Sequence, residues 1–106
     1  MVEYRHVFIR IWDYDVPADA VPAFCAAYSS HGDWVELFAR AVGYLSTELY
    51  RAPDHTGHFL AIDRWRTEQD WHAFRARFGA DYDALDARLD GLAATERSLF
   101  EGVSEP

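Results

Sequence analysis

Hydrophobic and polar positions alternate with two different periods along this chain, and the changes between them predict the order of its elements. Residues 4–14 alternate with a period of two, which predicts a strand. Its two faces carry Val7, Ile9, Ile11 on one side and His6, Phe8, Arg10, Trp12, Tyr14 on the other. Because both faces hold large apolar side chains, we expect both to be covered in the folded protein.

A helical period follows this strand. Residues 16–19 begin a predicted helix, and residues 29–32 interrupt it. Asp33 is expected to cap a second short helix, with Glu36 at the capping-box position. The apolar positions of the two helices, spaced by three or four residues, are Val21, Phe24, Cys25, Tyr28 and Trp34, Leu37, Phe38, Ala41. Each helix therefore has one apolar side to bury.

The middle of the chain has the pattern of a β-hairpin that leads directly into a helix. Residues 43–51 and 58–66 are the predicted strands, and the connection of residues 52–57 contains Pro, Asp and Gly as turn formers. Thr67 is expected to cap the helix, and we expect a bend at Gly79. The apolar positions keep a helical spacing across this bend: Trp71, Phe74, Phe78, Tyr82, Leu85, Leu89, Leu92.

Residues 94–103 form the last predicted strand, so the order is strand, helix pair, strand, strand, helix, strand. Right-handed connections between these elements predict an α+β, ferredoxin-like βαββαβ fold with a four-stranded antiparallel sheet and helices on one face. The 106 residues suit a single domain, residues 1–106. The other sheet face needs an apolar cover, and a second copy of the chain would supply it in a homodimer, a dimeric α+β barrel.

Charge and composition narrow the classes of partner and reaction. The net charge is −8 without any basic run, which argues against nucleic acid and anionic membranes as partners. All ten cations are Arg, so Schiff-base chemistry by a Lys is excluded. Cys25 is the single cysteine, which leaves no intrachain disulfide. With no signal-peptide core or membrane-spanning run, the expected location is the cytoplasm.

The hairpin and the helix after it carry a resemblance to a known family. Gly43-Tyr44-Leu45, Glu48-Leu49, residues 63–68, Trp71 and Phe74 resemble the antibiotic biosynthesis monooxygenase family, and the similarity extends over about residues 5–103. The resemblance implies a homodimer with one pocket in each subunit, between the helices and the sheet. Some members oxidise an electron-rich aromatic substrate with dioxygen, without a metal or organic cofactor, so we expect no cofactor here.

The family resemblance also suggests which side chains take part. Those members rely on an Asn of the first strand and a Trp at the end of the third strand, and the haem-degrading branch adds a His on the following helix. Trp65 matches the Trp. The chain contains no Asn, and Phe74 and Arg75 occupy the positions of the helical His.

Trp65, Arg10 and His72 are the candidate catalytic residues. The indole N–H of Trp65 can donate to a flat substrate on which its ring stacks, although a core position is the alternative. If the face of Arg10 points into the pocket, its guanidinium can bind a phenolate or carboxylate; if it points into the barrel, Glu48 or Asp63 must pair with it. His72 lies near the pocket helix and could equally be a surface residue.

Four aromatic residues are expected to contact the substrate: Trp12, Tyr14, Tyr28 and Trp34. The last two flank the break between the helices, where a pocket mouth is expected, and Tyr14 could relay a proton. His31 in this break is an acid/base candidate or an exposed loop residue. His55 and His58 lie near a turn without enough further ligands, so no metal site is expected. Asp63 is interpreted as a cross-strand partner.

The family resemblance implies, as the leading hypothesis, a small dimeric enzyme that oxygenates an aromatic, polyketide-like molecule without a cofactor. The substrate would lose a proton, and the resulting carbanion would give an electron to dioxygen inside a dry pocket. Two alternatives remain open. One is a polyketide cyclase that uses acid/base groups in the same pocket, and the other is a dimer that binds a small molecule without turnover.

Overall fold

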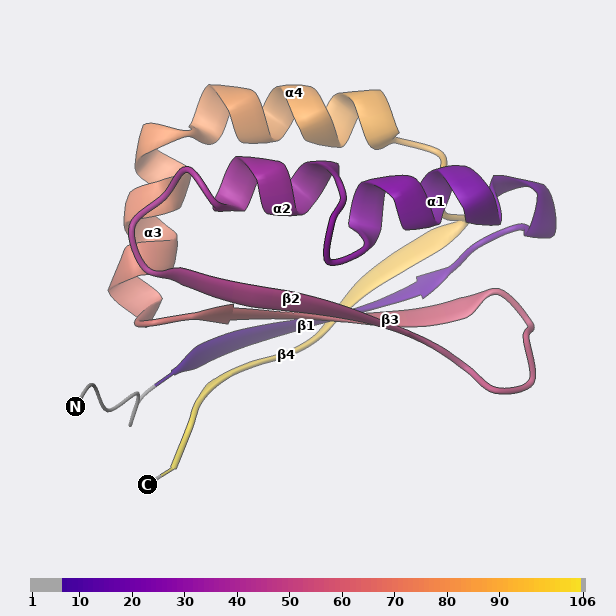
Figure 1. Ribbon diagram of the computed structural model, residues 1–106, viewed down its shortest axis with the longest axis horizontal. Coiled ribbons are helices and arrows are strands. Elements are labelled where there is room, and N and C mark those ends of the chain that lie inside the picture. Colours follow the sequence, from indigo (N-terminus) through magenta and orange to yellow (C-terminus); the bar gives the residue numbers. More distant parts are fainter. Residues whose placement is uncertain (1–6, 106) are drawn as a thin grey trace.

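The computed structural model describes residues 7–105, which form a four-stranded antiparallel sheet with every helix on one of its faces (Figure 1). The elements in chain order are β1 (Phe8–Asp15), a 3-10 turn (Ala18–Ala20), α1 (Val21–Tyr28), α2 (Asp33–Phe38), β2 (Tyr44–Arg51), β3 (His58–Trp65), α3 (Glu68–Arg77), α4 (Gly79–Leu89) and β4 (Thr95–Val103). The strand order is β2-β3-β1-β4. The predicted α+β, ferredoxin-like fold is therefore confirmed.

The first strand shows which of its faces the helices cover. Phe8, Arg10, Trp12 and Tyr14 face the helices, since each is buried or lines the space beneath them. The alternate residues, such as Ile11, lie on the other face of the sheet. The predicted beginning of this strand at residues 4–6, including His6, lies outside the described residues.

The break between α1 and α2 depends on Gly32. It is the residue that precedes α2, and a Cβ there would lie 2.4 Å from the carbonyl oxygen of Ala27. Only glycine fits so close to the end of α1. The prediction that Asp33 caps α2 is wrong: Asp33 is the first residue of the helix, and it accepts a hydrogen bond of 2.7 Å from Arg88 of α4 instead.

The predicted cap and bend of the second helical region are both present. The Thr67 hydroxyl accepts a hydrogen bond of 3.0 Å from the backbone N–H of Asp70 and so begins α3. The helix ends at Arg77, and α4 starts at Gly79 in a different direction (Figure 1). The apolar spacing continues across this change, and the residues that pack toward the sheet are Trp71, Phe74, Phe78, Tyr82, Leu85 and Leu89.

Aromatic side chains fill most of the core between the sheet and the helices. Trp65, Phe24 and Phe74 are the largest fully buried side chains. The ring centroids of Trp65 and Phe74 are 5.3 Å apart, and Phe24 stacks on Tyr28 at 4.3 Å. Such contacts add to the burial energy of each ring and hold the helices in a defined position over the sheet.

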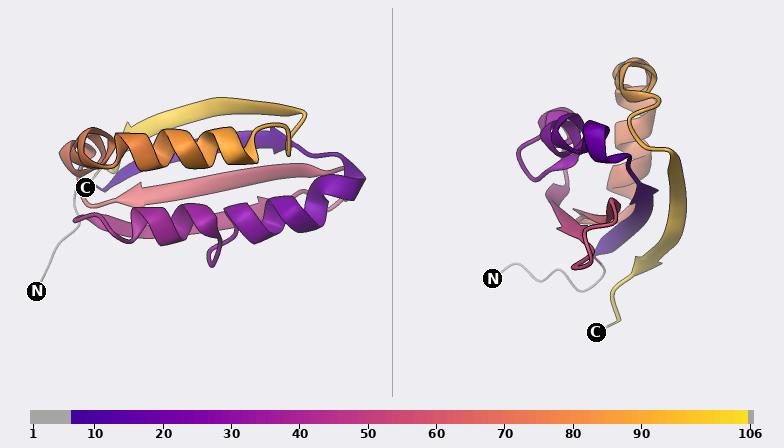
Figure 2. Two further views of the ribbon diagram at one scale, coloured as in Figure 1. Left: turned by 90° about the horizontal axis from the view of Figure 1, so that it is seen from above. Right: turned by 90° about the vertical axis from the view of Figure 1, so that its right-hand side faces the viewer.

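The sheet face opposite the helices is open in the isolated chain (Figure 2). Tyr50 and Phe100 are more than half exposed on it, and the strand register places them beside Leu60 and Ile11. None of the described helices has the length and hydropathy needed to span a membrane.

An ionic group around Asp13 interrupts this apolar face. Asp13 is almost fully buried between the side chains of His58 and Arg97, both of which contact its carboxylate. The hydrogen bond from Arg97 holds the pKa of Asp13 below its usual value, and the Asp13 carboxylate raises the pKa of His58. A charged group of this kind makes the face polar around Asp13, as the Glu48–Arg64 ion pair does near β2.

Candidate functional site

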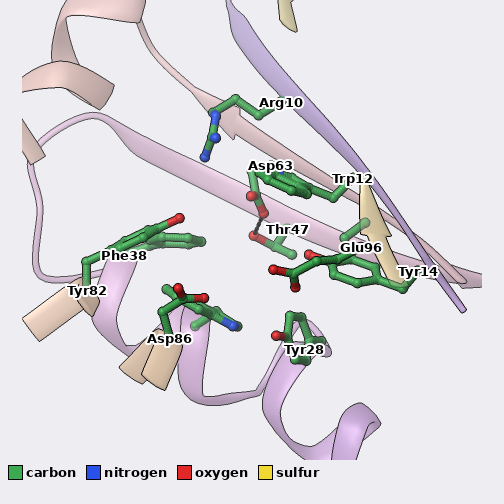
Figure 3. Close-up of a pocket in the computed structure, with 12 residues that line it drawn as sticks. Arg10, Trp12, Tyr14, Tyr28, Phe38, Thr47, Asp63, Tyr82, Asp86 and Glu96 are labelled. Atoms are coloured by element: carbon green, nitrogen blue, oxygen red, sulfur yellow. Dashed lines mark hydrogen bonds between the residues drawn. The ribbon is translucent and has the colours of Figure 1, made fainter. Parts of the chain in front are cut away.

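A pocket lies between the sheet and the helices, and its walls come from all four strands and from α1, α2 and α4 (Figure 3). Its cavity volume is about 50 Å³, and one side is open to solvent. One water needs roughly 10–15 Å³ of such volume. The pocket therefore accommodates a small ring, and a larger ring system would extend through the mouth.

Arg10 occupies the sheet side of this pocket, 8% exposed. Its Nε donates a hydrogen bond of 2.9 Å to the Glu101 carboxylate on β4, and its guanidinium carbon lies 3.9 Å from the ring centroid of Trp71. Arg10 thus points into the pocket and is also paired. The expected pairing with Glu48 is wrong, because Glu48 lies on the open face and pairs with Arg64.

Asp63 is the second charged group of the sheet wall, and it lies opposite Arg10 in the register of β1 and β3. A chain of hydrogen bonds holds it: Tyr44 donates to the Thr47 hydroxyl at 2.8 Å, and Thr47 donates to Asp63 Oδ1 at 2.7 Å. Burial raises the pKa of Asp63 to about 6, although Thr47 and Arg10 both favour its charged form. A buried carboxyl that titrates near neutrality can act as a general base.

The role of Asp63 as a pocket residue was missed in the sequence. The available signal was its spacing of two from Ala61 and Trp65, which placed a carboxylate on the apolar face of β3. Thr47 was missed as well, because the register that brings it beside Asp63 is a property of the assembled sheet.

Aromatic and acidic side chains form the rest of the pocket wall. Trp12, Tyr14, Tyr28 and Trp34, which the sequence predicts to contact a substrate, all line it. Tyr82 and Asp86 of α4 and Glu96 of β4 complete the wall, without a signal in the sequence that separates them from surface residues. Whether these side chains bind a substrate stays a prediction.

The hydroxyl and indole groups of this wall are poorly solvated. Burial raises the pKa of Tyr28 to about 12 and also raises that of Tyr82, which the neighbouring Arg10 moderates. Trp34 is 8% exposed. Its N–H is close enough to the Tyr28 hydroxyl to lower the pKa of that tyrosine, but the two lack hydrogen-bond geometry, and Nε1 has no other partner among the described residues.

The structure does not bring Trp65 or His72 to the pocket wall. Trp65 is fully buried between β3 and the helices, with its ring centroid 5.6 Å from that of Phe38, and its Nε1 has no partner among the described residues. His72 is exposed on α3, and its Nε2 lies 3.1 Å from the Glu68 carboxylate. Since Trp71 and Phe74 face the sheet, His72 points outward.

Two further histidines lie in loops and do not line the pocket. His31 is exposed between α1 and α2, and His55 lies at the β2–β3 connection with a positive φ of 58°. Within residues 7–105, no three His, Cys, Asp or Glu side chains are grouped closely enough to hold a metal ion.

The protein is a small α+β domain with helices on one face of a twisted antiparallel sheet. The aromatic pocket between the two layers has the features of a ligand-binding site. Residues 8–79 match the family model described as antibiotic biosynthesis monooxygenase, and the chain belongs to this family. Among curated proteins, none matches the chain.

Solved structures show the same fold at low sequence identity. SnoaB from Streptomyces nogalater, described as a cofactor-independent oxygenase, was solved as a mutant that shares 19% identity and superimposes with a TM-score of 0.65 over 96% of this chain and 93% of its own. A candidate antibiotic biosynthesis monooxygenase from Nitrosomonas europaea shares 16% identity and superimposes with a TM-score of 0.69 over 100% of this chain and 95% of its own. Rv0793 from Mycobacterium tuberculosis shares 21% identity and superimposes with a TM-score of 0.64 over 94% of this chain and 94% of its own.

Proposed function

We propose that this protein is a cofactor-independent monooxygenase of electron-rich aromatic compounds, in which Asp63 removes the proton that activates the substrate. The observation that carries the proposal is the position of Asp63: a buried carboxylate, fixed by Thr47, in an aromatic pocket beside Arg10. Family membership and the similarity to SnoaB, described as a cofactor-independent oxygenase, support the same class of reaction.

The proposed reaction begins with proton transfer from an acidic C–H group of the substrate to Asp63. The carbanion that forms gives one electron to dioxygen, and the two radicals combine. For an anthrone, the methylene carbon loses two hydrogens and gains one oxygen atom, and the second oxygen atom leaves as water. Atoms and electrons balance with dioxygen as the only co-reactant.

The other pocket residues would serve this reaction through charge and exclusion of water. The Arg10 guanidinium faces the place where negative charge develops, and a preorganised cation there stabilises the transition state. Trp12, Tyr14 and Tyr28 would hold the flat ring and keep water from the carbanion. The roles that the sequence suggested for Trp65 and His72 have no contact with the pocket to support them.

Oxygen uptake with an anthrone substrate tests the proposal. We expect uptake of one dioxygen per anthrone converted, with kcat/KM rising with pH through an apparent pKa of about 6 as Asp63 loses its proton. An oxygen electrode and product analysis measure both quantities. Formation of a cyclised product without oxygen uptake would instead support the cyclase alternative.

We also propose that the functional unit is a homodimer in which two copies pack their open sheet faces together. Phe100 is 56% exposed and lies beside Ile11, and a second copy would bury both. The single, unpaired Cys25 fits a reducing compartment, so the proposed location is the cytoplasm.

Phe100→Glu is expected to weaken this dimer at least tenfold, because it places a charge in an apolar interface. Sedimentation velocity over a range of protein concentrations measures the change. Val42→Glu is the matched control, since Val42 is 71% exposed in the connection between α2 and β2. A wild-type protein that stays monomeric, or an equal effect of both variants, would contradict the proposal.

A further inference from the structure

The pocket carries more negative than positive charge. Asp63, Asp86 and Glu96 line it, and Arg10 is the single cation among the described residues of its wall. The charge of Arg10 is already engaged by the ion pair with Glu101, whose carboxylate is 2.9 Å away. A ligand that enters this space therefore meets a net negative field, in which Arg10 is the one local positive group.

Asp86 and Glu96 concentrate this field on the side away from Arg10. The two side chains come from α4 and β4 and point into the same space (Figure 3). Asp86 and Glu96 are exposed overall, but partial burial raises the pKa of Glu96, and the neighbouring Asp86 and Asp90 raise it further. The same two pocket carboxylates contribute to the raised pKa of Tyr28. No nearby cation relieves this repulsion in the described wall.

The indole N–H of Trp34 is a second, independent observation that points to a ligand near Asp86 and Glu96. The residue is more than nine-tenths buried in the pocket wall, and its indole N–H lies near the Tyr28 hydroxyl but makes no hydrogen bond of good geometry with any described residue. A buried N–H without an acceptor destabilises the folded protein, and a ligand oxygen that accepts its hydrogen bond would remove that destabilisation. A ligand hydroxyl could accept from the indole and donate to a carboxylate at the same time.

We propose that Asp86, Glu96 and Trp34 form a subsite that accepts a hydroxyl or amino substituent of an aromatic ligand and rejects a carboxylate. The inference rests on the proposed aromatic substrate. It narrows that substrate to neutral or cationic ring compounds with a hydrogen-bond donor, and it excludes the carboxylate ligands that Arg10 alone would suggest.

Binding of three naphthalene probes with matched shape tests this selection directly. The probes are 2-naphthalenemethanol, 2-naphthylmethylamine and 2-naphthoate, titrated by calorimetry against the full chain at pH 7.5 and low salt. We expect the alcohol and the amine to bind at least tenfold more tightly than the carboxylate. The difference should shrink when salt screens the charges.

Two variants assign the selection to the proposed residues. The double variant Asp86→Asn, Glu96→Gln is expected to reduce the preference for alcohol over carboxylate at least fivefold. Asp83→Asn removes one charge from the same helix outside the pocket wall and should leave that ratio unchanged. Circular dichroism confirms that each variant is folded.

The inference is overturned if the carboxylate binds wild type as tightly as the alcohol does. It is also overturned if the folded double variant keeps the wild-type ratio. Absence of binding by all three probes would overturn both the subsite and the proposed aromatic ligand. Absence of oxygen uptake alone would overturn the proposed reaction and leave the measured charge selection in place.

Discussion

Asp63→Asn is expected to lower turnover by about 10² to 10⁴ and, above pH 6, to stabilise the fold. In the native protein the pKa of Asp63 is raised to about 6, whereas the unfolded chain has an ordinary value near 3.9. The stabilising contribution of the protonated carboxyl is therefore present below about pH 4 and is lost as pH rises through about 6. At pH 8 the ionised group costs roughly 2–3 kcal/mol, since one pKa unit is about 1.4 kcal/mol.

Urea unfolding at two pH values measures this effect. At pH 8 we expect the Asn variant to gain about 1–3 kcal/mol in the free energy of unfolding, and at pH 4 the gain should vanish. The Asn carbonyl can still accept the hydrogen bond from Thr47, so the sheet should keep its geometry. Loss of a positioned general base should lower kcat by about 10² to 10⁴.

Asp83→Asn provides the control for the change in net charge, because Asp83 is exposed on α4. It should alter neither the pH dependence of stability nor turnover. Equal destabilisation by Asp63→Asn at pH 4 and pH 8 would show that the carboxylate supports the fold, and retained turnover would remove it from the reaction.

Trp65→Ala is expected to lower the free energy of unfolding by about 3–5 kcal/mol, the usual cost of removing a large buried ring. Trp65→Phe should lower it by about 1–2 kcal/mol, because a smaller ring leaves part of the space empty. Trp65 is fully buried, and its N–H binds no group of the described protein, so the Phe variant should keep its turnover within about threefold of wild type.

Thermal unfolding and steady-state oxygen uptake on the same samples separate packing from chemistry. A Trp65→Phe variant that keeps near-native stability and loses more than a hundredfold in kcat would restore the catalytic role predicted from the sequence. His72→Ala, a change on the exposed side of α3, serves as the surface comparison and should change neither quantity.

Local patterns were sufficient to predict most of the fold. The spacing from Trp71 to Leu89 and the position of Gly79 predicted one helix with a bend or brief break, and the structure divides it there into α3 and α4, since periodicity and helix breakers act over a few residues. The prediction that Asp33 caps α2 was wrong, because the close approach of Gly32 to Ala27 depends on how α1 ends. That contact has no signature in the sequence.

The site was less predictable because it depends on which strand faces meet. The alternation of residues placed Arg10 on one face of β1. Because both faces of this strand carry large apolar side chains, the sequence did not show which face the helices cover. Asp63 and Thr47 come together only through the register of β2 and β3. Their side chains lie far apart in the sequence and carry no motif.

The walls of the pocket differ in how freely they can change during evolution or engineering. Arg10, Thr47 and Asp63 project from neighbouring strands, where one substitution disturbs hydrogen bonds on both sides. Tyr82 and Asp86 project from α4, which is separated from α3 by the bend at Gly79. Exchanging residues on α4 could therefore adapt the protein to new ring compounds while the reactive groups of the sheet stay in place.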